Sequence, residues 1–173
     1  MTESDTKMDQ RVDFTSGGQN PPMIMIILGE YYSEITAELL KGAVAEIEKS
    51  GAKYLVYRVP GAFEIPAAIR YAIRSMEIYP TRLRFNGYVA LGCVIEGETK
   101  HFDVVVEETA RALQQLAITY SLALGHGVIA ARNMEQALER AKTDRRNIGA
   151  EAAKACLQMI QLKLDFKLFP RLG

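Results

Sequence analysis

Short continuous apolar runs alternate along the chain with stretches in which apolar residues recur every three or four positions. A continuous run of four to eight apolar residues is typical of a strand that is buried on both faces of a parallel sheet. Four such runs occur, at Met23–Leu28, Tyr54–Tyr57, Tyr88–Leu91 and Gly125–Ala131. Their alternation with helical segments predicts a three-layer α/β/α domain, with a four-stranded parallel sheet, right-handed crossovers and helices on both faces.

Each helical segment has an apolar stripe that is expected to face the sheet. The four stripes are Ile35, Leu39, Ala43, Ile47; Ile65, Ile69, Ile73, Met76; Phe102, Val106, Ala110, Leu113, Ala117; and Ala152, Cys156, Met159, Ile160. Ser33 is expected to cap the first helix and Gly51 to end it. A short helix is expected after Asn133, with Gln136 at the capping-box position, and the polar stretch 143–147 should interrupt it.

The chain of 173 residues fits one folded domain. We expect a mobile tail at 1–22, a single domain at 23–166 and a loose end at 167–173. Lys plus Arg and Asp plus Glu both total 21, which argues against a nucleic-acid or anionic-membrane surface. No apolar run is long enough to span a membrane, and the start does not resemble a secretion signal, so the cytoplasm is the expected location. Two Cys and two His are too few for a metal site and fit a reducing compartment.

Three unusual segments follow the first three strands, namely Gly29–Ser33, Val59–Glu64 and Cys93–His101. Ligands of parallel α/β sheets bind beyond the carboxyl ends of the strands, where these segments should meet. Thr99 is expected to cap the helix that follows, which makes its first turn, with Glu98, a candidate phosphate site. His101 would stand beside the anion as a general acid or base. The alternative is an ordinary turn with a surface histidine.

Other residues at this edge have both a functional and an ordinary interpretation. Tyr31 would stack on a planar ring or simply pack. Glu64 would accept hydrogen bonds from sugar hydroxyls, or its charge would merely stabilise the start of a helix. The backbone N–H and C=O groups of Ala62 and Val94 would form hydrogen bonds with the edge of a heterocycle. Cys93 is a poor candidate for a thiolate because it ends a buried strand.

Four longer segments resemble the 6,7-dimethyl-8-ribityllumazine synthase family of riboflavin synthesis, and together they extend from about Met23 to Asp165. They are Ile35–Ala43, Val59–Pro66, Leu91–Asp103 and Asn133–Ala141. The resemblance implies a flavodoxin-like fold. It also implies condensation of 5-amino-6-(D-ribitylamino)uracil with 3,4-dihydroxy-2-butanone 4-phosphate, without a metal or redox cofactor.

The resemblance also implies roles for individual residues. His101 would transfer protons. The residues expected at the pyrimidinedione and ribityl chain are Tyr31, Ala62, Phe63, Glu64, Cys93, Val94, Ile95 and His126. Those expected at the phosphate are Glu98, Thr99 and Arg140, although the position of Arg140 alone suggests only a solvated surface residue.

In this family the arginine reaches a neighbouring subunit's site, so the resemblance implies a homo-oligomer built on pentamers, with riboflavin synthase as a candidate partner. The loop at 143–148 lacks the glycine-rich run of capsid-forming members. The double proline at 21–22 hinders the tail from adding a strand to a neighbour. Both features favour a free pentamer or a decamer.

Several positions depart from the family pattern, among them 130–132, and three departures bear on activity. Glu96 stands where Arg is common, Ile148 where many members have Lys, and His126 where an aromatic or other residue is expected from the neighbouring subunit. These departures motivate an alternative, a catalytically weak paralogue that binds flavin or lumazine as a storage or scaffold protein. A nucleotide-binding signalling domain of flavodoxin type is a third interpretation, which rests on fold alone.

Overall fold

Four parallel strands form the predicted sheet in the order β2-β1-β3-β4. The computed structural model describes residues 12–16, 20–80, 83–98 and 100–168. The strands are β1 (Met23–Gly29), β2 (Lys53–Val59), β3 (Gly87–Ile95) and β4 (Leu124–Ala131). The predicted α/β class and the four-stranded parallel sheet are therefore confirmed.

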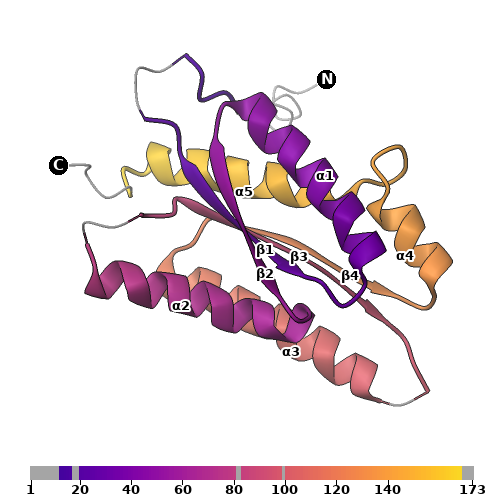
Figure 1. Ribbon diagram of the computed structural model, residues 1–173. Coiled ribbons are helices and arrows are strands. Elements are labelled where there is room, and N and C mark those ends of the chain that lie inside the picture. Colours follow the sequence, from indigo (N-terminus) through magenta and orange to yellow (C-terminus); the bar gives the residue numbers. More distant parts are fainter. Residues whose placement is uncertain (1–11, 17–19, 81–82, 99, 169–173) are drawn as a thin grey trace, which may run out of the picture.

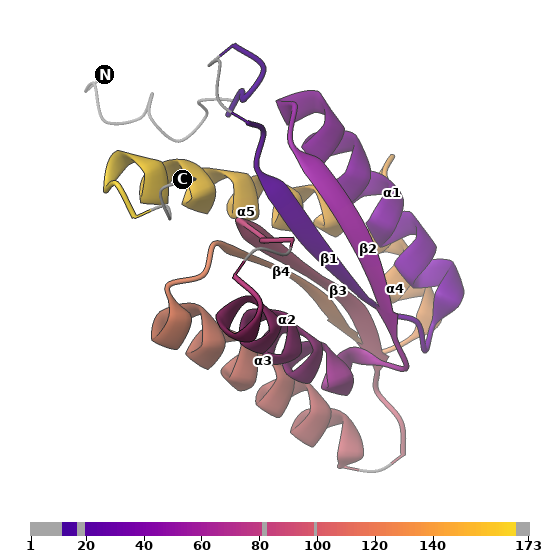
Figure 2. The ribbon, with the colours of Figure 1, turned by 60° about the vertical axis from the view of Figure 1, so that its left-hand side comes forward.

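Helices cover both faces of the sheet, as predicted. Figures 1 and 2 show three helices on one side, α1 (Ser33–Ser50), α4 (Met134–Ala141) and α5 (Ile148–Asp165). On the other side are α2 (Ile65–Ile78), which follows a short 3-10 turn at Ala62–Glu64, and α3 (His101–Tyr120). Each face of the sheet has its own apolar cluster, so the two sides of a strand contribute to different layers of the core.

Helix α1 follows its prediction except at its first residue. The side chains of Ile35, Leu39, Ala43 and Ile47 are fully buried, as the spacing predicts. Gly51 ends the helix with φ at +81°, in the left-handed region that glycine adopts without strain. The prediction for Ser33 is wrong, because Ser33 is already helical and its carbonyl accepts a hydrogen bond from the Thr36 hydroxyl at 3.3 Å.

The stripe predicted for α3 is wrong by a small rotation of the helix. The buried residues are Val105, Thr109 and Leu113, of which only Leu113 was predicted, and Ala110 is exposed. Lys100 holds the N-cap position that was predicted for Thr99, while Thr99 itself lies outside the described residues. Phe102 and the three valines at 104–106 are all apolar, so spacing alone does not select which of them faces the core.

The predicted inward face of α5 needs one correction. Ala152, Cys156 and Ile160 are buried, but Met159 is 42% exposed and Leu157 takes its place in the core. Leu157 follows Ala153 by four positions and precedes Ile160 by three, so these three side chains share a face. Met159 lies beside that face and therefore stays partly exposed to solvent.

The short helix α4 has the predicted cap. The Asn133 side chain accepts a hydrogen bond from the Gln136 backbone N–H at 2.8 Å. The Gln136 amide oxygen in turn accepts one from the Arg132 N–H at 2.8 Å, one residue earlier than a standard capping box. The helix ends at Ala141, as the polar stretch after it predicts.

A described part of the N-terminal segment contacts the domain. The Phe14 N–H donates to the Ser50 carbonyl at 2.8 Å, and Val12 and Phe14 pack against the cluster on the α1 side. The domain limits at residues 22 and 166 stay predictions. Among the described residues, no helix is long and apolar enough to cross a membrane.

Candidate functional site

Strands β3 and β4 continue beyond the point where β1 ends. The pairing of β1 with β3 reaches Leu28 and Leu91, whereas β3 and β4 stay paired as far as Ile95 and Ala131. The last four residues of β3, Gly92–Ile95, therefore extend past the end of β1 at the carboxyl edge of the sheet and are called the ledge below (Figure 1). The apolar run Tyr88–Leu91 predicted a shorter strand than the observed Gly87–Ile95.

The segments that follow β1 and β2 meet closely at this ledge. A Cβ atom added to Gly29 would lie 2.7 Å from the Gly61 carbonyl carbon and 2.9 Å from the Ala62 nitrogen. A Cβ on Gly92 would lie 3.4 Å from the Ala62 Cβ. Ala62 is thus the point at which the ends of three strands converge, as the sequence predicted for this edge.

Two aromatic side chains project from this point of convergence. Tyr31 is 76% exposed and Phe63 is 56% exposed, whereas Ala62, the residue before Phe63, is buried. The ring of Tyr31 contacts the ring of Tyr32 edge to face, with centroids 4.9 Å apart. A Cβ on Gly61 would lie 3.4 Å from Glu64 Oε2 and 3.8 Å from Tyr31 Cβ, so the Glu64 carboxylate and Tyr31 flank the same turn.

Cys93 and Val94 have opposite orientations on the ledge. Cys93 belongs to the cluster on the α1 side, whereas Val94 packs with the cluster on the α2 and α3 side. Burial raises the pKa of the Cys93 thiol to about 12, and the positive charge of Arg140 opposes that shift without cancelling it. The thiol is therefore neutral near pH 7, and Cys93 presents only its backbone toward α3. Ile95 is half-buried on the same side as Cys93.

Helix α3 brings His101 to the carboxyl edge of the sheet. The helix packs against the Ala62–Glu64 turn, and its first residue, His101, is exposed. The loop from β3 to this helix contains Glu96 and Glu98, which are both exposed. A helix N-terminus, a histidine and the aromatic residues are thus on the same edge, which suits proton transfer beside an anionic group.

Arg140 lies in the last turn of α4, and its side chain reaches the outer edge of β4. Its Nη1 donates a hydrogen bond to the Ala130 carbonyl. The Ala131 carbonyl accepts a hydrogen bond from the Glu96 N–H and so points toward β3. Carbonyls alternate in direction along a strand, so the Ala130 carbonyl points away from the sheet, and β4 is an edge strand. The guanidinium is therefore displaced toward the outside of the molecule.

His126 is not close to the other predicted site residues within this chain. It pairs with Ala90 in the first half of β4, whereas the ledge begins after Leu91. Although His126 as a residue is exposed, the surrounding protein desolvates its imidazole enough to lower the pKa. Ile148, another departure from the family pattern, is half-buried against the core on the α1 side.

An ion pair at this edge was not predicted from the sequence. The Arg58 guanidinium donates to the Glu30 carboxylate. Arg58 precedes the last residue of β2, and Glu30 follows β1 directly. The residues are 28 positions apart, so no local spacing indicates the pair, and only knowledge that β1 and β2 are neighbours would have suggested it.

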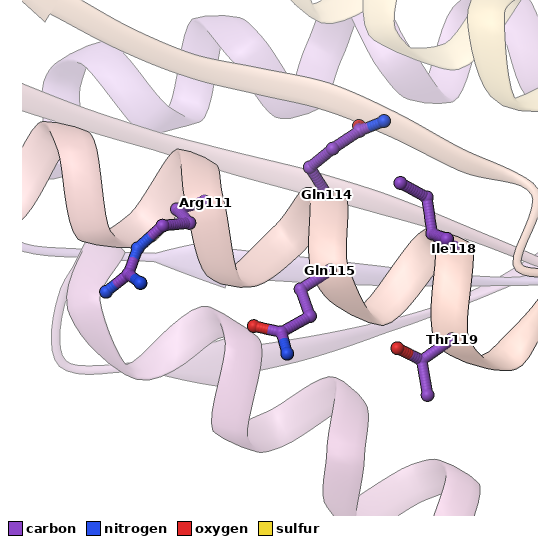
Figure 3. A pocket seen from close by; sticks show the side chains of 5 residues that line it. All are labelled: Arg111, Gln114, Gln115, Ile118 and Thr119. Carbon is purple, nitrogen blue, oxygen red and sulfur yellow. The ribbon is translucent and has the colours of Figure 1, made fainter.

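A shallow hollow on α3 is separate from this site. Figure 3 shows its lining, which comes from the later turns of α3: Arg111, Gln114, Gln115, Ile118 and Thr119. Its one ionisable side chain, Arg111, pairs with Glu108. In the described part of the chain, no group of three or more His, Cys, Asp or Glu side chains is arranged to hold a metal ion.

Comparison with known proteins bears directly on this site. Residues 22–164 match the family model of 6,7-dimethyl-8-ribityllumazine synthase. The protein of that name from Bartonella bacilliformis is 46% identical over 145 residues, which are 84% of this chain and 92% of the relative. That from Afipia carboxidovorans is 42% identical over 157 residues, 91% of this chain and 92% of the relative. That from Paramagnetospirillum magneticum is 40% identical over 145 residues, 84% of this chain and 97% of the relative. A match across nearly the whole folded domain shows that the chain belongs to the 6,7-dimethyl-8-ribityllumazine synthase family.

Proposed function

We propose that this chain condenses 5-amino-6-(D-ribitylamino)uracil with 3,4-dihydroxy-2-butanone 4-phosphate to give 6,7-dimethyl-8-ribityllumazine, the penultimate step of riboflavin synthesis. The observation that carries the proposal is the convergence of three strand ends on Ala62, with exposed aromatic rings beside it and His101 at the start of the adjoining helix. Because the chain belongs to the lumazine synthase family, the substrates of that reaction are the ones we expect to bind there.

The pyrimidinedione and its ribityl chain would bind between the aromatic residues and the ledge. Tyr31 has the exposure that stacking requires. Phe63 and Glu64 would hold the ribityl chain, with the carboxylate accepting hydrogen bonds from its hydroxyls. The backbone of Ala62, Cys93, Val94 and Ile95 would supply polar groups to the edge of the ring, which is consistent with the neutral, inward-facing Cys93 thiol.

The reaction is mainly proton transfer between two correctly oriented substrates. The amine attacks the ketone, a Schiff base forms, phosphate leaves and a second condensation closes the ring. His101 would take up and return the protons, because an imidazole can act both as a general acid and as a general base. Holding two substrates in register can supply up to roughly 7–11 kcal/mol of barrier lowering, and no covalent enzyme intermediate is required.

The phosphate would bind at the start of α3, at Glu98, Thr99 and Arg140, with Arg140 and His126 supplied by a neighbouring subunit. Support comes from the Arg140 guanidinium, which reaches from α4 to the Ala130 carbonyl on the outer side of β4, and from His126, which lies on β4 before the ledge begins. The family implies an oligomer, and we propose a pentamer as its unit. We also propose a cytoplasmic location and riboflavin synthase as a partner.

A complementation experiment tests the shared site. His101→Ala and Arg140→Ala chains, each expected to be strongly impaired alone at a limiting concentration of the butanone phosphate, are co-expressed in equal amounts. If one chain's His101 works with its neighbour's Arg140, ~25% of the interfaces in a mixed ring regain both residues and activity returns. Co-expressed chains as inactive as the separate variants would place both residues in one subunit's site.

The His101→Ala variant tests the chemistry itself. Loss of a general acid or base typically slows a reaction ~10²–10⁴-fold, so turnover should fall by an order of magnitude or more while the oligomer, measured by light scattering, stays intact. A rate close to that of the unaltered protein would remove His101 from the mechanism. An unaltered protein that binds flavin or lumazine without turnover would instead support the paralogue with a storage role.

A further inference from the structure

The three-residue connection between β1 and α1, Glu30–Tyr32, carries the most exposed aromatic residue of the candidate site. Tyr31 is 76% exposed, so the protein core contributes little to fixing its ring. A ring that stacks on a substrate must nevertheless be held close to its productive orientation before binding, or binding energy is lost in ordering it. The residues on either side of Tyr31 therefore determine where it stands.

The connection is anchored on both sides of Tyr31. After it, the Tyr32 ring packs against the core, and its carbonyl accepts a hydrogen bond from the Thr36 N–H at 3.0 Å. Before it, the Glu30 N–H donates to the Val59 carbonyl at 3.0 Å. That backbone bond fixes the chain at Glu30 but leaves free the rotation of the peptide that leads into Tyr31.

The side chain of Glu30 supplies a second restraint at that point. Its carboxylate accepts a hydrogen bond from Arg58 Nη1. Arg58 lies on β2, opposite Leu28 of β1, and its backbone is therefore fixed in the sheet. Two attachments to β2, one through the backbone and one through the side chain, hold Glu30 more firmly than either does alone.

The restraint is transmitted to the ring by close packing. Gly29, next to Glu30, lies so near the Gly61–Ala62 peptide that a Cβ would not fit between them. On the other side, the Tyr31 ring meets the Tyr32 ring at an interplanar angle of 72°. A displacement of Glu30 consequently moves Tyr31 relative to Ala62, where we place the pyrimidinedione.

We propose that Glu30 and Arg58 are positioning residues, whose ion pair across the ends of β1 and β2 orients Tyr31 for stacking on the pyrimidinedione. The consequence for catalysis rests on the proposed function, whereas the orientation of Tyr31 does not. The pair is partly solvated, with side chains 41% and 54% exposed. Its loss should therefore raise the KM for the pyrimidinedione only about two- to fivefold.

Kinetics on charge variants test the catalytic part. Arg58→Gln and Glu30→Gln should each raise the KM for the pyrimidinedione and leave that for the butanone phosphate unchanged. The exchanged pair, Glu30→Arg with Arg58→Glu, should recover most of the loss. The matched control is Arg74→Gln, which breaks the exposed pair of Arg74 with Glu77 on α2, 3.0 Å apart, and should leave both constants unchanged.

A spectroscopic measurement tests the orientation without any turnover. In ¹⁹F NMR of protein labelled with fluorotyrosine, the Tyr31 signal is assigned by its absence in Tyr31→Phe. Arg58→Gln should shift and narrow that signal, the exchanged pair should restore it, and Arg74→Gln should leave it in place. An unmoved Tyr31 signal in both Arg58→Gln and Glu30→Gln would overturn the proposal.

The two measurements also separate this proposal from the proposed function. If the unaltered protein makes no lumazine, the proposed function fails, while the NMR result still decides whether the ion pair orients Tyr31. If the protein is active and the signal moves but neither KM changes, the pair does not serve catalysis and the proposal is refuted. Equal changes in both KM values would likewise refute a specific role at the pyrimidinedione.

Discussion

Replacement of Gly29 by Ala tests whether the site depends on the close contact between the ends of β1 and β2. The added methyl would lie 2.7 Å from the Gly61 carbonyl carbon and 2.9 Å from the Ala62 nitrogen. Ordinary contacts begin near 3.4 Å, so the two backbones must separate by about 0.5–0.7 Å, which closely packed interiors resist. Overpacking of this kind costs ~1–3 kcal/mol, which corresponds to a fall of roughly 2–12 °C in Tm for a chain of this size.

The matched control is Gly97→Ala, because nothing lies within 4 Å of the Cβ position on Gly97. Neither glycine has a positive φ, so the difference between the variants reports the contact and not backbone strain. Thermal unfolding gives Tm, and steady-state kinetics should show a raised KM for the pyrimidinedione in Gly29→Ala. If Gly29→Ala is as stable as Gly97→Ala and its KM is unchanged, the two strand ends do not meet as described.

Three further predictions concern the cap of α4, the phosphate site and alkaline pH. Asn133→Ala removes the acceptor of the Gln136 N–H and should lower the free energy of unfolding by about 1 kcal/mol in urea denaturation; no change would mean that solvent replaces the cap. Arg140→Ala should raise the KM for the butanone phosphate far more than that for the pyrimidinedione, and equal effects would indicate a structural role. Burial raises the pKa of Cys93 and Cys156 from 9.0 to about 12, so the fold favours the neutral thiols. The stability that they contribute is complete below pH 9 and is lost as the pH rises toward 12; urea midpoints should fall over that window, and less steeply in Cys156→Ser.

The elements of this fold were predictable because their signals are local. A run such as Met23–Leu28 is too short and too uniformly apolar for an exposed helix, and Ile35, Leu39, Ala43 and Ile47 have the period of one helical face. Both signals depend only on neighbours within a few residues. The exact rotation of α3 was not predictable, because nearly every residue between Phe102 and Val106 is apolar, and tertiary packing selected Val105 from among them.

Some features of the candidate site were likewise predictable from the sequence, and others were not. Its place at the carboxyl edge follows from a general property of parallel sheets, and the segments that carry Tyr31 and His101 were marked by glycines, prolines and a helix start. The Glu30–Arg58 pair was not predictable, since it depends on which strands are neighbours. The position of the Arg140 guanidinium at the outer edge of β4 was not predictable either. It depends on the strand order and on the direction of the Ala130 carbonyl, and the sequence of α4 specifies neither.

The most direct test of the whole account is a steady-state assay of the purified protein with both substrates, followed by the absorbance of the lumazine. We predict formation of 6,7-dimethyl-8-ribityllumazine well above the spontaneous rate, with saturation in each substrate, and loss of that rate in His101→Ala. Formation at no more than the spontaneous rate, by protein that is folded and assembled, would contradict the account.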